Sequence, residues 1–214
     1  MKNFVYDPTL ALYLPLWQKD SPTFMSSDHY GHLVTRTGAV WTSQGHSLDG
    51  VDDSFLLGDP ASLELGSSPF TIEVVCRRTE TGRADRILGK IAGGWVSGSW
   101  QLYFETDDKL YFADAAATSV STTETFAANI FYHIIVSKTG TGAGGLTITV
   151  NNILKATGTC IDFGNSPDNL YLGRLETSGY FKGLISEASI YLRAFNVSER
   201  TNHYIAAKRR LPWL

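Results

Sequence analysis

Short stretches of alternating apolar and polar residues, separated by turn-forming residues, recur along the whole chain and restrict the folds open to it. Residues 70–78 show the pattern best, with Phe70, Ile72, Val74 and Cys76 in phase. Side chains alternate between the two faces of a β-strand, so this period is typical of a strand with one buried face. Similar stretches lie at residues 10–17, 47–57, 87–90, 100–105, 109–113, 131–137, 146–150, 153–156, 170–173 and 184–191. The pattern predicts an all-β protein built from short antiparallel strands.

The turn residues and the length of the chain fit this interpretation. Of the 214 residues, 20 are glycines, which adopt the positive φ angles of tight turns at little cost. Asn151 and Asn152 separate two predicted strands and suit a tight hairpin, because asparagine tolerates left-handed backbone. A chain of this length buries most of its apolar surface without disulfides, so we expect a single domain over residues 1–214.

One segment near the C-terminus has helix signals instead. Asn196 can cap a helix, and Glu199 follows at the spacing of a capping box. The run after it is compatible with a helix and ends in basic residues, which suit the negative end of the helix dipole. We expect a helix at about residues 196–208, followed by a tail at 209–214.

Charge and hydropathy argue against several classes of protein. The net charge of −3 does not suit non-specific binding to nucleic acid, and no stretch approaches the ~20 apolar residues of a membrane span. Cys76 and Cys160, the two cysteines, provide neither a disulfide framework nor a metal-binding spacing. The N-terminal residues lack the apolar run of a signal peptide. We therefore expect synthesis in the cytoplasm and no nucleic-acid or membrane partner.

Several stretches, taken in order, resemble the motifs of one family. They are LDGVDD (48–53), FTIE (70–73), ILGK (87–90), FYHIIV (131–136), VNN (150–152), YLGR (171–174), FKGLISEASIY (181–191) and RAF (193–195). Together they resemble the laminin-G-like, concanavalin A-like lectin/glucanase jelly-roll domain family. The resemblance implies two antiparallel sheets packed face to face as a jelly-roll sandwich, with a short C-terminal helix.

The resemblance also implies structural calcium, which some members of the family hold on such loops. Asp49, Asp52 and Asp53 offer hard oxygen ligands in one turn, and Glu187 is a further candidate in the stretch that matches the family's I-D-E motif. The aspartate of that motif is Ser186 here, which removes one charged ligand. The alternative is that the aspartates only cap turns.

Aromatic residues provide candidate contacts for a carbohydrate, because sugars bind to aromatic platforms with a few polar groups beside them. Trp95 lies in a glycine-rich stretch that we expect to form a loop or hairpin tip. Trp100, Tyr103, Tyr111 and Tyr180 could lie near it. The alternative is that these rings fill the core of the sandwich or pair across hairpins, as aromatic residues commonly do.

The sequence argues against catalysis. Related laminarinase-type glucanases use carboxylates about 5 Å apart on one face of a strand, within an E-x-D-x-E stretch. The nearest stretch here, residues 105–108, lacks the second glutamate and is typical of a hairpin turn. We expect no enzyme activity, and a glycoside hydrolase is the weakest alternative.

The C-terminal tail is apolar and follows basic residues. If it is exposed, Arg209, Arg210, Trp213 and Leu214 form a docking site for a partner, since free surfaces rarely expose such apolar segments. The alternative is that Trp213 folds back onto the domain.

Two functional classes suit these features. The first is a free-standing, lectin-like module that binds a glycan or a protein surface. The second is a structural or adhesion component of a phage virion, in the head decoration or the tail, which meets virion proteins or copies of itself. A chain with its own start methionine and no export signal suits packing into a particle that lysis releases. We expect a non-enzymatic virion protein built on a lectin-like domain, with the free-standing carbohydrate-binding module as the alternative.

Overall fold

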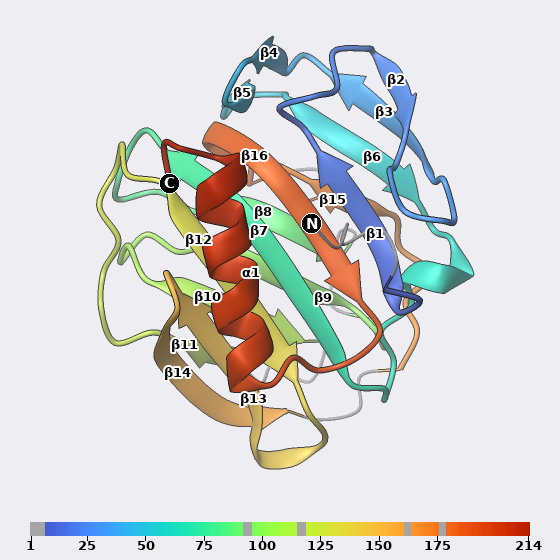
Figure 1. The fold of residues 1–214 in the computed structure, drawn as a ribbon, viewed down its shortest axis with the longest axis vertical. Coiled ribbons are helices and arrows are strands. Elements are labelled where there is room, and N and C mark those ends of the chain that lie inside the picture. Colours follow the sequence, from blue (N-terminus) through green and yellow to red (C-terminus); the bar gives the residue numbers. More distant parts are fainter. Residues whose placement is uncertain (1–6, 92–95, 115–118, 161–163, 176–178) are drawn as a thin grey trace.

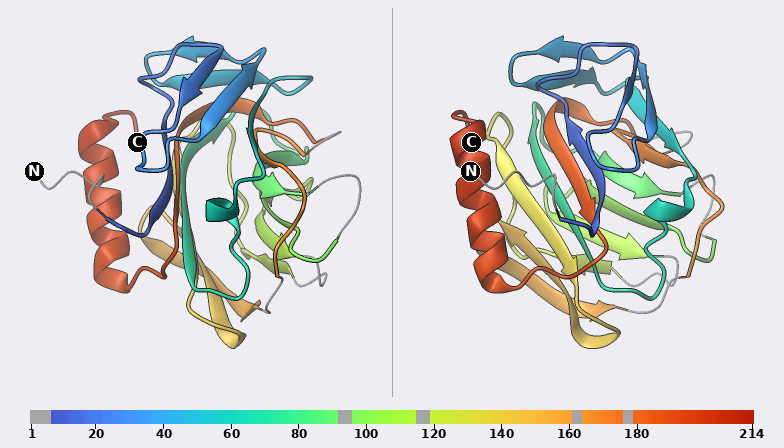
Figure 2. Two further views of the ribbon diagram at one scale, coloured as in Figure 1. Left: turned by 90° about the vertical axis from the view of Figure 1, so that its right-hand side faces the viewer. Right: turned by 45° about the vertical axis from the view of Figure 1, so that its right-hand side comes forward.

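The computed structural model describes residues 7–91, 96–114, 119–160, 164–175 and 179–214. The strands form two antiparallel β-sheets, and one helix lies outside one of the sheets (Figure 1, Figure 2). The prediction of an all-β jelly-roll sandwich with a short C-terminal helix is confirmed.

Sheet A has eight strands. In the order in which they pair, they are β14 (Ile153–Cys160), β13 (Gly142–Val150), β12 (Tyr132–Lys138), β7 (Phe70–Arg78), β16 (Lys182–Tyr191), β5 (Gly45–Asp49) and β4 (Val40–Thr42), and β1 (Leu10–Pro15) pairs with the second half of β16. β16, near the C-terminus, therefore pairs with three strands from the first half of the chain, namely β7, β5 and β1.

Sheet B also has eight strands. In order, they are β11 (Ser119–Ser121), β10 (Leu110–Asp114), β9 (Trp100–Phe104), β8 (Asp85–Lys90), β15 (Leu170–Leu172), β6 (Ser54–Gly58), β3 (Leu33–Thr37) and β2 (Thr23–Met25). A short 3₁₀ turn, η2 (Ala61–Leu63), follows β6.

The core lies between the inner faces of the two sheets. Phe70 and Ile72 of β7 belong to one buried cluster with Leu102 of β9 and Phe112 of β10, and the rings of Phe70 and Phe112 lie 5.9 Å apart. Burying each side chain of this kind contributes about 1.5–3 kcal/mol. Cys76 is buried in the same cluster, as its phase in the predicted strand requires.

The predicted strand at residues 47–57 is in fact two strands, β5 and β6. Gly50 between them has a φ of +79°, and the Asp49 carboxylate accepts a hydrogen bond from the Val51 amide at 2.8 Å. This turn ends β5 and lets the chain pass from sheet A into sheet B. The hairpin predicted at Asn151 and Asn152 is confirmed, with positive φ angles of 49° and 64°.

The helix α1 (Val197–Arg210) begins with the predicted capping box. The Asn196 side chain accepts a hydrogen bond from the Glu199 amide at 3.0 Å, and the Glu199 carboxylate accepts one from the Asn196 amide at 2.8 Å. The helix ends at Arg210, slightly beyond the predicted end, and crosses the outer face of sheet A over β12, β7 and β16 (Figure 1). In the part of the chain that the structure describes, no helix is long and apolar enough to cross a membrane.

Charged groups are buried between α1 and sheet A. On β7, Glu73 lies between two histidines, with Oε1 at 2.7 Å from His133 Nε2 and Oε2 at 2.8 Å from His203 Nδ1 of the helix. Burial alone would raise the pKa of Glu73, but the charges and hydrogen bonds of His203 and His133 hold that pKa well below its ordinary value. An ionised Glu73 therefore ties the helix to the sheet, beside the apolar contacts that α1 makes there.

Candidate functional site

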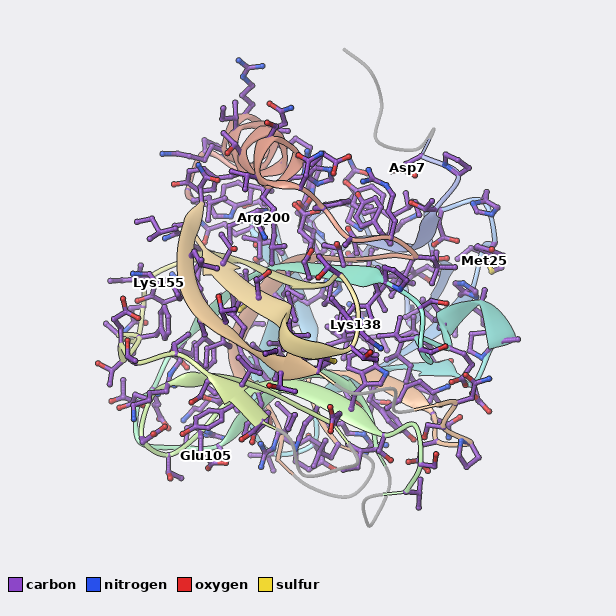
Figure 3. All side chains as sticks on the ribbon, turned by 90° about the horizontal axis from the view of Figure 1, so that it is seen from below. Asp7, Met25, Glu105, Lys138, Lys155 and Arg200 are labelled. Carbon is purple, nitrogen blue, oxygen red and sulfur yellow. The ribbon has the colours of Figure 1, made fainter. Side chains whose placement is uncertain are left out.

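The outer face of sheet B lies on the side of the molecule opposite α1. Figure 3 shows Arg200 of α1 and Glu105, directly after β9, on opposite sides of the sandwich. Leu102 and Phe104 of β9 point into the core, so Gln101 and Tyr103 point outward, because neighbouring side chains alternate between faces.

The same alternation assigns the side chains of the adjacent strands. Tyr111 precedes the core residue Phe112 of β10, and Tyr171 lies between core residues of β15. We call this outward-facing set the tyrosine face, and it comprises Arg86, Gln101, Tyr103, Tyr111, Tyr171 and Arg174.

Stacked rings form the centre of the tyrosine face. The rings of Tyr103 and Tyr111 lie 5.4 Å apart with an interplanar angle of 20°. The Arg86 guanidinium covers Tyr103, with its carbon 4.1 Å from the ring centroid, and the Tyr111 hydroxyl donates a hydrogen bond to Asp107 at 3.0 Å. Burial raises the pKa of both tyrosines, so their hydroxyls stay protonated and neutral.

Gln101 lies beside these rings and has an unmet hydrogen-bonding group. Gln101 is only 5 % exposed. The Oε1 atom of its side chain is buried with no hydrogen-bond partner among the described residues. Its partners in register on the neighbouring strands are Gly89, which has no side chain, and Ala113, whose methyl group cannot form a hydrogen bond. A buried carbonyl without a donor costs about 1–3 kcal/mol, so a hydroxyl donor at this position would stabilise it.

The acidic turn between β5 and β6 is a second candidate site. Carboxylate oxygens of Asp49, Asp52 and Asp53 all lie within 4.8 Å of one another. Asp49 accepts the amides of Val51 and Asp52, and Asp53 accepts the Asp49 amide at 2.9 Å, so the predicted turn-capping role is confirmed for Asp49 and Asp53. Burial raises the pKa of Asp53, and the charges of Asp49 and Asp52 raise it further, a repulsion that a bound cation would relieve.

A family model covers most of the residues described above. It is of the laminin-G type, is described as the Concanavalin A-like lectin/glucanases superfamily, and matches residues 49–199. The chain belongs to this superfamily. The family resemblance stated from the sequence motifs is therefore confirmed, whereas no curated protein matches the chain.

Solved structures agree on the fold of this member of the superfamily. The Trypanosoma rangeli sialidase in complex with sialic acid is 14 % identical, with a TM-score of 0.71, and the match covers 95 % of this chain but only 34 % of the sialidase. Domain 4 of AbnA, an extracellular arabinanase from Geobacillus stearothermophilus in complex with arabinotriose, is 17 % identical, with a TM-score of 0.71. That match covers 91 % of this chain and 97 % of the domain. At these identities, the likeness concerns the fold alone.

Only part of the predicted aromatic set lies on the tyrosine face of this lectin-like sandwich. Trp100 as a ligand contact is wrong, because it is 1 % exposed and packs inside the core 6.1 Å from the ring of Phe112. Tyr103 and Tyr111 are on the face, and the Tyr180 hydroxyl accepts a hydrogen bond from Arg174 at its edge. Trp95 lies outside the described residues.

Sequence reasoning missed four residues of the tyrosine face, namely Arg86, Gln101, Tyr171 and Arg174. For Tyr171 and Arg174 the sequence contained a signal, because both lie in the YLGR stretch that matched the superfamily. Gln101 also had one, because it alternates with two apolar neighbours in the predicted strand.

The structure corrects two predictions about the metal site. Glu187 is wrong as a ligand of the acidic turn, because it is buried under α1, where its Oε1 accepts a hydrogen bond from Arg210 at 2.6 Å. The Ser186 hydroxyl donates a hydrogen bond to the Gln44 carbonyl. The residue of β16 that pairs with Asp49 is Lys182, and Ser186 lies about 13 Å further along β16 at the usual rise per residue. Serine at position 186 therefore removes no ligand from the aspartate trio.

The predicted docking tail folds back onto the superfamily fold. Trp213 and Leu214 pack against the cluster of Val75, Phe131 and Leu184 on sheet A, and the rings of Trp213 and Phe131 lie 6.3 Å apart. With Arg210 bound to Glu187, three of the four predicted docking residues make contacts within the chain. Only Arg209 is exposed.

The hairpin predicted at residues 105–108 is confirmed. Asp108 has a φ of +63°, and its amide donates to the Glu105 carbonyl at 2.9 Å. Glu105 Oε2 lies 3.8 Å from Arg86 Nη1, and Asp107 accepts the Tyr111 hydroxyl. The carboxylates of Glu105 and Asp107 thus lie beside the tyrosine face and contact its side chains.

Proposed function

We propose that this protein binds a glycan through the tyrosine face and carries out no catalysis. The observation on which the proposal rests is Gln101, whose buried carbonyl has no partner among the described residues and lies beside a stacked tyrosine pair. A sugar supplies hydroxyl donors for such a carbonyl and an apolar ring face for the tyrosines.

The placement of the tyrosine face supports the same proposal. Helix α1 covers the outer face of sheet A, whereas no helix of the described residues covers the outer face of sheet B (Figure 2). The arabinanase domain that shares the fold was solved with arabinotriose, which supports a saccharide as the class of ligand.

Replacing Tyr111 with alanine is expected to weaken glycan binding by about twofold to tenfold, since a stacked aromatic contact is worth about 0.5–1.5 kcal/mol. A glycan array identifies a ligand, and titration calorimetry then measures its affinity for each variant. Tyr30→Ala serves as the matched control, because Tyr30 is 47 % exposed and stacks on His32 outside the tyrosine face.

Gln101→Leu separates binding from folding. Removing a buried, unpaired carbonyl should leave the melting temperature unchanged or raise it, while the affinity for the glycan falls because its donor loses an acceptor. The proposal is wrong if both Gln101→Leu and Tyr111→Ala bind the glycan as the unmodified protein does.

We also propose that the acidic turn binds calcium as a structural ion. The trio offers three carboxylates, and oxygen ligands of this kind suit calcium. At calcium about a hundredfold above Kd, we expect the melting temperature to rise by about 5–10 °C. Asp52→Asn should abolish this rise and leave the calcium-free melting temperature unchanged, because Asp52 is exposed. Equal melting temperatures in calcium and in chelator would contradict the calcium proposal, and Asp20→Asn controls for loss of a surface charge.

From the sequence, we also propose that the protein is a component of a phage virion. Its partners would then be other virion proteins or further copies of itself. A glycan-binding face suits an adhesion role on a particle as well as it suits a free-standing lectin. The genes that flank this one distinguish these settings, since a virion protein is expected among head and tail genes.

A further inference from the structure

Two arginines lie at one end of the tyrosine face, each held flat against a ring. The carbon of the Arg174 guanidinium is 4.3 Å from the centroid of Tyr171 and 5.8 Å from that of Tyr180, and Arg174 Nη1 donates to the Tyr180 hydroxyl at 3.2 Å. Arg86 covers Tyr103 in the same way. Because stacking limits their rotamers, both guanidinium groups are positioned before any ligand arrives.

The two arginines lie toward the same end of the strand pair formed by β15 and β8. Leu172 of β15 pairs with Leu88 of β8, and the Gly173 amide donates to the Ile87 carbonyl at 2.8 Å. Arg174 follows Gly173 just beyond the end of β15, and Arg86 precedes Ile87 in β8, where the Arg86 amide donates to the Gly179 carbonyl at 3.1 Å. The pair therefore concentrates positive charge beside the rings of the tyrosine face.

Little negative charge offsets this pair. Arg174 forms no ion pair with a carboxylate of the described residues, and the only such contact of Arg86 is with Glu105, at 3.8 Å. Arg83, also nearby, is different, because Asp85 lies 2.9 Å from its Nε. Arg86 Nε and Arg174 Nε are buried with no hydrogen-bond partner in the same described part of the chain.

We propose that Arg86 and Arg174 bind an anionic substituent, a carboxylate or a sulfate, of the glycan that the tyrosine face holds. This inference rests on the proposed glycan function and names its ligand class. A planar guanidinium matches both oxyanions through paired N–H donors, and a fully neutral saccharide would leave this charge uncompensated. The preferred ligand is therefore an acidic saccharide.

The test is a glycan array printed with pairs that differ in one carboxylate or in one sulfate. The acidic member of at least one kind of pair is expected to bind at least about tenfold more tightly, and added NaCl should weaken that preference. A preference within the carboxylate pairs identifies the anion as a carboxylate, and a preference within the sulfate pairs identifies it as a sulfate. Arg174→Gln should remove most of the preference, with a loss of about tenfold to a hundredfold for the acidic glycan and a much smaller loss for its neutral counterpart.

Arg209→Gln is the matched control, because it removes the same charge from an exposed position on α1. Arg86→Gln tests the pair a second time if Arg174→Gln does not fold. If acidic and neutral partners bind alike, or if Arg209→Gln loses as much affinity as Arg174→Gln, the acidic ligand class is wrong while the glycan function stands. If the unmodified protein binds no glycan of either kind, both proposals fail.

Discussion

Replacing Glu73 with alanine is expected to lower the free energy of unfolding by about 3–5 kcal/mol, the usual cost of removing one partner from a buried charged contact. The Glu73 side chain is 3 % exposed and contacts His133 on β12 and His203 on α1. Without the carboxylate, both histidines keep a buried nitrogen that has lost its acceptor. Chemical denaturation measures the loss, and hydrogen exchange should show faster opening of α1 than of β7 and β12.

Glu124→Ala is the matched control, because its side chain is 50 % exposed and its carboxylate pairs with Lys155 and Thr123 at the surface. Surface pairs of this kind contribute little, so no measurable change is expected. A Glu73→Ala variant as stable as the control would contradict the account of the helix interface.

The effect of Glu73→Ala should also depend on pH. The folded pKa of Glu73 lies below its ordinary value of 4.5, so the contribution of the carboxylate is fully present above that pH. It is lost as the pH falls below 4.5, toward the lower folded value. The stability difference between the unmodified protein and the variant should therefore shrink in acid.

Replacing Trp100 with alanine is expected to destabilise the protein by about 3–5 kcal/mol, because it empties a large volume in the core. Trp100 is 1 % exposed and stacks near Phe112. Trp100→Phe should fold and keep its affinity for the glycan, since position 100 does not reach the tyrosine face. Thermal melting and calorimetry together check both statements.

Trp41→Ala is the control for this core substitution. Trp41 is 39 % exposed, so its loss should cost no more than about 1 kcal/mol. If Trp100→Phe is folded but no longer binds the glycan, Trp100 acts in recognition after all, and the assignment of the two faces of β9 is wrong.

Much of the fold was predictable because strand alternation is local. The strand at residues 70–78 and the hairpin at Asn151 and Asn152 needed only neighbouring residues. The short strands β2 and β3, of which β2 forms an edge of sheet B, were missed, since three to five mostly exposed or half-buried residues leave little alternation. The break at Gly50 was missed because only the pairing partners show that β5 and β6 belong to different sheets.

The site was less predictable because a shift of one residue reverses the face of a strand. Trp100 and Gln101 are adjacent, yet the first is in the core and the second is on the tyrosine face. The register shift between Arg86 and Leu88 also depends on the partner strand. Glu187 looked available as a metal ligand because nothing local indicates that α1 covers the outer face of β16.

The central claim, that a glycan binds on the outer face of sheet B, is tested most directly by NMR titration of the labelled protein with a glycan identified on the array. The account predicts chemical-shift changes in β9, β10 and β15, centred on Gln101, Tyr103 and Tyr111. Changes confined to α1 and sheet A, or to the acidic turn at Asp49, would contradict it.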